Sequence, residues 1–254
     1  MKTSITNSKT IEKLCAIVIA LKVWHIAAMA LGQEILLVSP IRVIQQLSVL
    51  CVEKQFWQSI LFTFSRIVTG FLTALIAGTI LGVVAARVHI VEILLWPYVA
   101  VIKASPVASF IILCLIWTSA DNLSVIISFL IVLPVVYTNI LQGMKATDKK
   151  MLQMASVYKL STAKCIKYIY IPALKPYFMA ACSIAVGMSW KSGTAAEVIG
   201  IPGGSIGEKL YKAKVYLSSA DLLAWTVVII VISVICEKLV ILLVQRFYKA
   251  LERS

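Results

Sequence analysis

The sequence has little charge, and acidic charge is the scarcest. Asp, Glu, Lys and Arg together make up 14% of its 254 residues, where about a quarter is usual in soluble proteins. Hydrophobic residues make up 61%, against roughly 45–50% in a soluble domain. Because a soluble core of this size could not bury so much apolar surface, the composition predicts an integral membrane protein.

The sequence also lacks the residue clusters that mark enzymes and metal sites. Its six cysteines are scattered without a C-x-x-C pair, which argues against a metal site or a disulfide framework. The stretch Gly203–Lys209 superficially suggests a phosphate loop, but Leu210 stands where that loop needs Ser or Thr. We therefore expect a glycine-rich turn there, and no catalytic site, metal or cofactor bound by this chain.

The net charge of +13 raises the question of nucleic acid, because basic patches are the usual footprint of such binding. Here the Lys and Arg residues interrupt apolar runs and gather at their ends, which suits anchoring beside anionic lipid. The charge pattern thus predicts contact with membrane lipid and no nucleic-acid partner.

Six apolar segments have about the length, roughly 20 residues, that a helix needs to cross the hydrocarbon core. The first could also be a signal peptide ending near Ala28-Met29-Ala30, but Lys22 interrupts it and further spans follow. The mixed segment Ser39–Trp57 is predicted to form a short outer helix that starts at Ser39-Pro40. The predicted spans are Leu14–Leu31, Ser59–Ala86, Ile93–Trp117, Leu123–Gly143, Ile169–Trp190 and Leu222–Val244.

These segments predict an all-α integral membrane protein. Residues 1–57 would form an N-terminal tail, the first span and the outer helix, and residues 58–250 the main transmembrane domain. The loop at 144–172 carries six lysines against Asp148 alone, which places it in the cytoplasm. Both termini then lie in the cytoplasm as well, consistent with Lys2, Lys9, Lys13, Arg246, Lys249 and Arg253. The lysines of Lys191–Asp221, which this topology puts outside, count against it.

The loop Met144–Pro172 contains an amphipathic pattern. Met151, Met154, Ala155 and Tyr158 recur at the spacing of one helix face, with Thr147 or Asp148 available as N-cap. Ser161 could cap a second short helix, and Pro172 is expected to kink the start of the fifth span. Two short helices across the cytoplasmic face would make a docking surface for a partner.

This loop resembles one found in the binding-protein-dependent permeases of ATP-driven importers. In that family the loop begins Glu-Ala-Ala, has Gly after three further residues, and ends nine residues later in Ile-x-Leu-Pro. Here Gln153-Met154-Ala155, Lys159 and Ile169-Tyr170-Ile171-Pro172 stand at those positions. The resemblance is closest to the nitrate, sulfonate and taurine branch and covers roughly residues 38–250. Further matches are Ser39-Pro40, Arg66, Gly70, Phe71, Pro106, Trp117, Ala195-Ala196-Glu197, Gly203, Gly204 and Gly207.

The resemblance implies a permease subunit that works by alternating access in the bacterial plasma membrane. Its partners would be a cytoplasmic ATPase in two copies, an extracytoplasmic solute-binding protein and a second, identical permease. ATP would be used by the ATPase alone. The loop residues that would couple to it are Gln153, Met154, Ala155, Lys159, Ile169 and Pro172. Lys159 must either bear a positive φ, which costs a non-glycine residue about 1–2 kcal/mol, or use another turn.

Charged side chains within spans are expensive and invite a functional interpretation. Arg66 would suit a structural pair with an acidic residue as well as a functional role. The segment Trp190–Glu197 couples a cation, two hydroxyls and a carboxylate to small residues. We expect Lys191, Ser192, Thr194 and Glu197 to line or gate the path, with Lys191 attracting an anionic solute, or an ion pair merely to fix the gate.

Three other functions remain open at this point, and one of them is an exporter subunit, whose chain would usually carry or fuse the ATPase domain. A secondary transporter or channel working alone would leave the cytoplasmic loop without a role, and the sequence shows no internal repeat of the kind many such transporters have. A membrane enzyme would need a buried acid, base or metal cluster. The resemblance implies a small anion such as a sulfonate or nitrate as the solute, with specificity set mostly by the binding protein.

Overall fold

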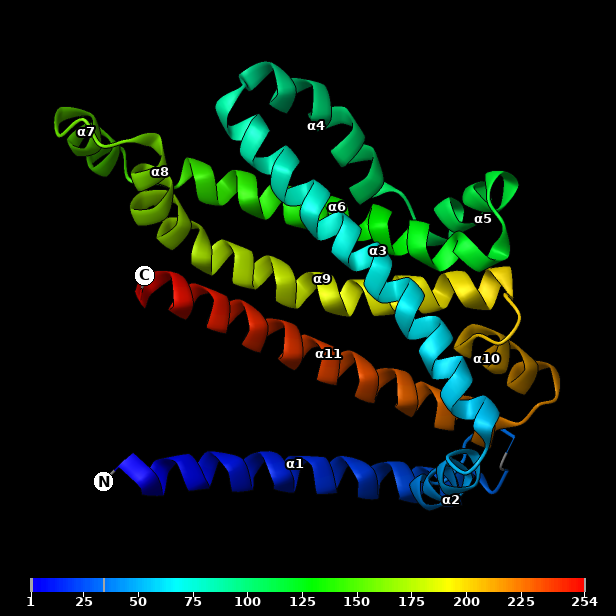
Figure 1. Cartoon of the computed structure of the whole chain (residues 1–254). Helices are drawn as coiled ribbons and strands as arrows, with labels where there is room; N and C mark the ends of the chain where they lie inside the picture. Colours follow the sequence, from blue (N-terminus) through cyan, green and yellow to red (C-terminus); the bar gives the residue numbers. More distant parts are fainter. Residues whose placement is uncertain (1, 34, 254) are drawn as a thin grey trace.

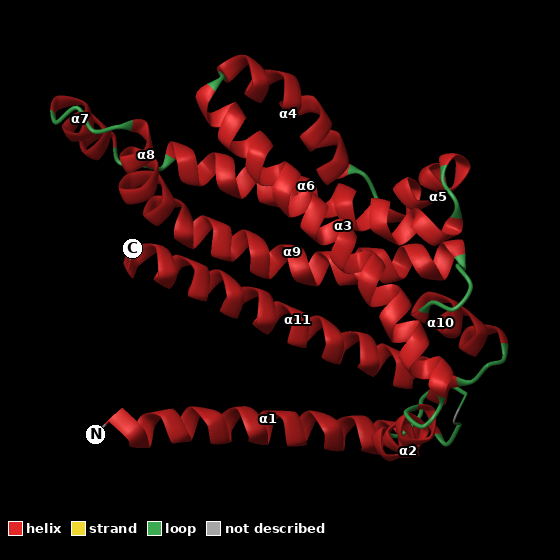
Figure 2. Ribbon diagram, in the orientation of Figure 1, coloured by secondary structure: helices red, strands yellow, loops and turns green. Residues whose placement is uncertain are grey.

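The computed structural model describes residues 2–33 and 35–253, and all regular structure in those ranges is helical (Figure 2). Five helices are long and apolar enough to cross a membrane, or six if one sharply bent pair counts as a span. The all-α membrane fold predicted from the sequence is therefore confirmed. The side chains of Lys2, Lys9, Lys13 and Arg253, used to predict orientation, lie outside the described side chains.

Five long helices correspond to the first, second, fourth, fifth and sixth predicted spans. Helices α3, α6 and α9 form the centre of the bundle, α11 packs against α9, and α1 stands apart beside α2 (Figure 1). Buried apolar side chains from α3, α6 and α9, together with Cys236 of α11, make the main core. The helices are α1 (Lys2–Leu31), α3 (Lys54–Arg87), α6 (Ala120–Lys145), α9 (Ile171–Gly200) and α11 (Ser219–Arg253).

Glycines let α3 and α6 approach closely. A Cβ at Gly78 would lie 2.9 Å from Val136 Cβ, and one at Gly82 would lie 2.8 Å from Ile140 Cβ. Helix association in lipid depends on such packing, since lipid tails are as apolar as the side chains. Close approach of the two backbones therefore fixes how α3 packs against α6.

The third predicted span, Ile93–Trp117, is wrong as a single helix. The structure has α4 (His89–Ala104) and α5 (Val107–Trp117) instead, bent by 108° at Ser105-Pro106. Pro106 has no N–H, and its ring disfavours helical backbone at the residue before it. Ser105 accordingly has extended backbone, so the chain turns there rather than continuing across.

A short helix precedes the second span, as predicted, but it is shorter than the segment Ser39–Trp57. Helix α2 runs over Pro40–Leu50, with Ser39 Oγ accepting from Arg42 N at 3.4 Å. Figure 1 places α2, α5 and α10 (Ile206–Val215) at one end of the bundle. The start of α1, the end of α11 and the loop helices lie at the other.

The loop between α6 and α9 forms α7 (Lys149–Val157) and α8 (Thr162–Cys165). Ser161 caps α8 as predicted, accepting from Lys164 N at 3.5 Å. The second helix is not separate, however, because it continues through a π-helical turn over Ile166–Tyr170 into α9. The turn ends two residues before Pro172. Proline has no N–H to donate to the carbonyl one turn back, and its ring clashes with that carbonyl. The wider hydrogen-bond spacing of the π-helical turn relieves this clash.

Candidate functional site

Helix α7 begins at a side-chain cap. Asp148 Oδ1 accepts a hydrogen bond from Lys150 N at 2.8 Å, which satisfies one of the free N–H groups of the first turn. Thr147, the other predicted cap, is buried and donates instead to Gly143 O at 3.3 Å. Asp148 thus starts α7 while Thr147 closes the end of α6.

The apolar face of α7 is largely uncovered. Met151 is 49% exposed, Met154 52% and Tyr158 73%, while Ala155 is buried. Gln153 and Lys149 are exposed elsewhere on the same helix. Exposed apolar side chains rimmed by polar ones mark interaction sites, and α7 projects from the end of the bundle (Figure 1).

Lys159 ends α7 with a left-handed backbone, at φ 51°. Lys159 N donates to Ser156 O at 3.1 Å and Leu160 N donates to Ala155 O at 2.9 Å. This pair of bonds is the Schellman motif, which satisfies the last carbonyls of a helix and usually has Gly at the left-handed position. Of the two alternatives for Lys159, the chain therefore keeps the turn and bears the strained backbone.

The remaining loop residues lie where the chain enters the bundle. Ile169 is buried within the π-helical turn, and Pro172 occupies the first turn of α9. Gly143, at the end of α6, packs so closely on α9 that an added Cβ would lie 2.9 Å from Leu174 and 3.0 Å from Tyr177. The loop is therefore joined to the spans at both ends without slack.

Glu197 is fully buried where α3, α9 and α10 meet. Its Oε2 accepts from Thr63 Oγ1 at 2.7 Å and from Gly207 N at 3.2 Å. Thr63 Oγ1 in turn accepts from Ile206 N at 3.0 Å. The other carboxyl oxygen of Glu197 and the Ser124 hydroxyl are buried without a hydrogen-bond partner among the described residues.

Lys191 and Glu197 do not form the ion pair considered above. They lie six residues apart, which places them about 120° apart around a helix, and Lys191 is exposed while Glu197 is buried. Ser192 and Thr194 are buried, and their hydroxyls donate to Met188 O and Trp190 O of α9 itself. Of these four residues, Lys191 alone presents a polar side chain on the uncovered face of α9.

Arg66 links α3 to the start of α6. Its Nε donates to the backbone oxygen of Asp121 at 2.5 Å, and its guanidinium lies 3.6 Å from the centre of the Phe62 ring. Arg66 thus binds the backbone carbonyl of Asp121 and not its carboxylate.

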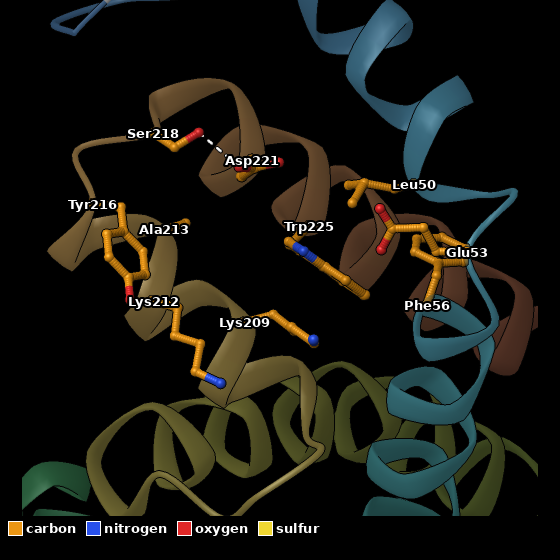
Figure 3. A pocket seen from close by; sticks show the side chains of 10 residues that line it. All are labelled: Leu50, Glu53, Phe56, Lys209, Lys212, Ala213, Tyr216, Ser218, Asp221 and Trp225. Carbon is orange, nitrogen blue, oxygen red and sulfur yellow. Dashed lines mark hydrogen bonds between the residues drawn. The ribbon is translucent and has the colours of Figure 1, made fainter.

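The end of the bundle that contains α2, α5 and α10 has a pocket of about 160 Å³ between the α2–α3 turn, α10 and α11 (Figure 3). Lys209 and Glu53 enter it from opposite walls, with Trp225 between them. Lys212 Nζ donates to Glu208 Oε1 at 2.6 Å, and this ammonium group lowers the pKa of Glu208 below its ordinary value. Lys209 Nζ donates to Gln55 Oε1 at 3.1 Å. Two of the lysines that counted against the topology, Lys209 and Lys212, thus have local partners.

Sequence comparison identifies the chain's relatives. The family described as "Binding-protein-dependent transport system inner membrane component" matches residues 78–254. The chain belongs to this family. The match includes α4 to α11, and therefore the whole of the α7–α8 loop.

Several relatives are permeases for anions or sulfonates. The taurine transport system permease protein of Escherichia coli (strain K12) is 23% identical over 84% of this chain and 80% of its own length. The nitrate import permease protein of Synechococcus elongatus is 27% identical over 73% of this chain and 70% of its own length. That of Synechocystis sp. is 26% identical over 98% of this chain and 90% of its own length. The predicted family and branch are confirmed.

Two contacts of this permease escaped the sequence interpretation. Thr63 binds Glu197 across 134 positions of sequence, and Lys145 binds Glu92 across 53. The sequence signal was present, since a hydroxyl or charge in an apolar run needs a partner. The sequence did not show which residue is the partner, because that depends on which helices pack together.

Proposed function

We propose that this chain is the membrane-spanning permease subunit of an ATP-driven importer for small anions, with the ATPase on a separate polypeptide. Membership of the binding-protein-dependent family supports the importer class. Relatives named for taurine and nitrate support a small anion or sulfonate as the solute. The chain itself would bind no cofactor, and ATP would act only on the partner.

The uncovered face of α7 is the observation that carries the proposal. Met151, Met154 and Tyr158 expose apolar surface at the end of the bundle, where a membrane would not cover it. We assign this face, with Gln153, Ala155 and Lys159, to docking of the cytoplasmic ATPase. Ile169 and Pro172 then connect the docked loop to α9.

A second copy of the chain would complete the path. The face of α9 with Lys191 also exposes Ile184 and Met188, and α5 packs on Ala195 one turn beyond Lys191. Two such faces opposed across a twofold axis would enclose a channel with Lys191 on both sides. The ammonium groups would attract an anionic solute, while Glu197 and Arg66 fix the helices behind them.

Alternating access follows from differential binding at the two ends. A loaded binding protein docks outside on α2 and α10, and ATP closes the ATPase subunits on the α7–α8 loops inside. Each ligand shifts the equilibrium only by its difference in affinity for the two states. This topology places both termini and the loop in the cytoplasm, consistent with their common end of the bundle (Figure 1).

The test is co-purification of the chain with the ATPase and binding protein encoded beside its gene, followed by ATPase and uptake assays in lipid vesicles. We expect a stable complex whose ATP hydrolysis rises with loaded binding protein. Met154→Glu should abolish the complex, whereas Ser156→Glu, which adds the same charge away from the apolar face, should leave it intact. Purification of the chain alone, with solute transport that needs no ATP, would overturn the proposal in favour of a secondary transporter or channel.

A further inference from the structure

An ion pair joins the start of α4 to the end of α6. Lys145 Nζ lies 2.6 Å from Glu92 Oε1, and His89 Nδ1 lies 3.6 Å from the other carboxyl oxygen, Glu92 Oε2. Glu92 is in the first turn of α4, and Lys145 is the last residue of α6. The carboxylate is thus held both from its own helix and from a neighbouring span.

This pair lies at the joint between the bundle and the α7–α8 loop. Asp148, which caps α7, follows Lys145 by three residues. Gly143 packs closely on α9, and Thr147 donates back to the Gly143 carbonyl. A displacement of α7 therefore reaches Lys145 through a short connection that leaves little room for slack.

Helix α4 is a separate rod with few other attachments. Val91, Leu95 and Val99, spaced as one helix face, pack on Ala85, Tyr137 and Leu141. Near its other end, Lys103 Nζ donates to Thr138 Oγ1 of α6 at 3.4 Å. The sixteen residues of α4, which include Pro97 inside the helix, span about 24 Å, and the chain bends by 108° before α5 begins.

We infer that the Glu92–Lys145 ion pair is a strut that carries movement of the α7–α8 loop into α4. Lys145 moves with the loop, Glu92 follows it, and α4 turns about the break at Ser105-Pro106. If α4 and α5 together form one broken span, the proposed topology makes α4 its cytoplasmic half, and rotation of α4 would change the width of the path at that end. This inference rests on the proposed function, in which an ATPase moves α7.

A purely structural role for the Glu92–Lys145 ion pair predicts a different result from a coupling role. Lys145 has a side chain that is 53% exposed and Glu92 one that is 24% exposed, and ion pairs this accessible add little to folding stability. If the ion pair is only a surface contact, removing it changes neither folding stability nor transport. If it is a strut, removal leaves folding unchanged and uncouples ATP hydrolysis from solute movement. The number of solute molecules moved per ATP distinguishes the two.

The experiment uses the complete complex of permease, ATPase and binding protein in lipid vesicles. Glu92→Gln and Lys145→Gln should each lower the solute moved per ATP by at least about fivefold, the lower end of typical coupling energies. Their thermal unfolding and the amount of bound ATPase should stay unchanged. The charge swap Glu92→Lys with Lys145→Glu should restore most of the ratio. Lys238→Gln removes an exposed α11 lysine that has no hydrogen bond or ion pair with a described residue, and it serves as the control.

The outcomes separate the inference from the function on which it rests. A normal ratio in both single variants, or a swap that fails to restore the ratio, overturns the strut. Loss of bound ATPase in the single variants also overturns it, because the pair would then act in docking. If the unsubstituted complex shows no ATP-dependent uptake, the proposed function fails, and the strut fails with it.

Discussion

Thr63 and Glu197 bind each other at 2.7 Å although each side chain is fully buried. The same Thr63 oxygen accepts from Ile206 N, and Glu197 also accepts from Gly207 N. One hydroxyl and one carboxyl group therefore join α3 and α9 to the first turn of α10. The start of α10 is thereby tied to the centre of the bundle.

Removing the Thr63 hydroxyl should destabilise the protein. Thr63→Val keeps the shape of the side chain but leaves Ile206 N without its acceptor and Glu197 Oε2 with Gly207 N as its remaining donor. Unsatisfied buried polar groups cost about 1–3 kcal/mol, which we expect as a lower unfolding temperature in detergent. Thr79→Val is the control, since the Thr79 hydroxyl donates only to Leu75 O of its own helix. Equal effects of both variants would contradict this account.

Gly207 should tolerate no side chain. A Cβ there would overlap Glu197 Cβ and the backbone of Glu197 and Val198, and backbone atoms cannot swing away. We expect Gly207→Ala to cost at least about 1–3 kcal/mol, the usual range for overpacking. Gly203→Ala, in the turn just before α10 and with nothing within 4 Å of the added atom, should be nearly neutral. Thermal unfolding of the two variants compares them directly.

Lys159→Gly should stabilise α7 locally. Its φ of 51° is strained for a side chain with a Cβ, and relieving that strain is worth about 1 kcal/mol. Slower hydrogen exchange in the amides of α7 would show the gain. Ser156→Gly, inside the same helix, should have the opposite sign because Gly weakens helix interiors. Faster exchange in Lys159→Gly would show that the lysine side chain has a stabilising contact of its own.

The stability of α10 should fall in acid, because its Lys212–Glu208 ion pair is lost when Glu208 is protonated. Lys212, as donor to Glu208, lowers the pKa of Glu208 below its ordinary value. A carboxyl with a lower pKa in the folded state adds stability above its unfolded pKa, about 4.3, and loses it as pH falls through the folded pKa. We expect hydrogen-exchange protection of α10, corrected for intrinsic rates, to be constant near neutral pH and to fall below about pH 4. In Glu208→Gln the protection should be low and independent of pH over that interval.

Lys191 should matter for the charge of the solute. Lys191→Ala should reduce uptake of an anionic solute by about 10-fold, as expected for loss of one charge-assisted contact of about 1.5 kcal/mol. Lys191→Arg keeps the charge and should retain most of the uptake. Measured uptake in vesicles at fixed ATPase activity is the readout. Unchanged rate and solute preference in Lys191→Ala would remove this residue from the path.

Local chemistry sufficed to predict much of the fold. Apolar length located the spans, Ser39, Asp148 and Ser161 announced three helix starts, and the spacing of Met151 and Tyr158 predicted α7. Each of these features depends on neighbours within a few residues, which the sequence displays directly. The break at Pro106 was also visible in principle, but length alone favoured one continuous third span.

Contacts between distant helices were decided only by the tertiary structure. The sequence placed Lys191 and Glu197 in one segment, yet helical rotation sends Lys191 outward and Glu197 to Thr63. It likewise gave no reason to join Glu92 to Lys145. A charge or hydroxyl in an apolar run indicates that a hydrogen-bonding or charged partner is needed, because burying the group without one costs free energy. Which partner it finds depends on the rotation and packing of whole helices, and that is settled only when the bundle assembles.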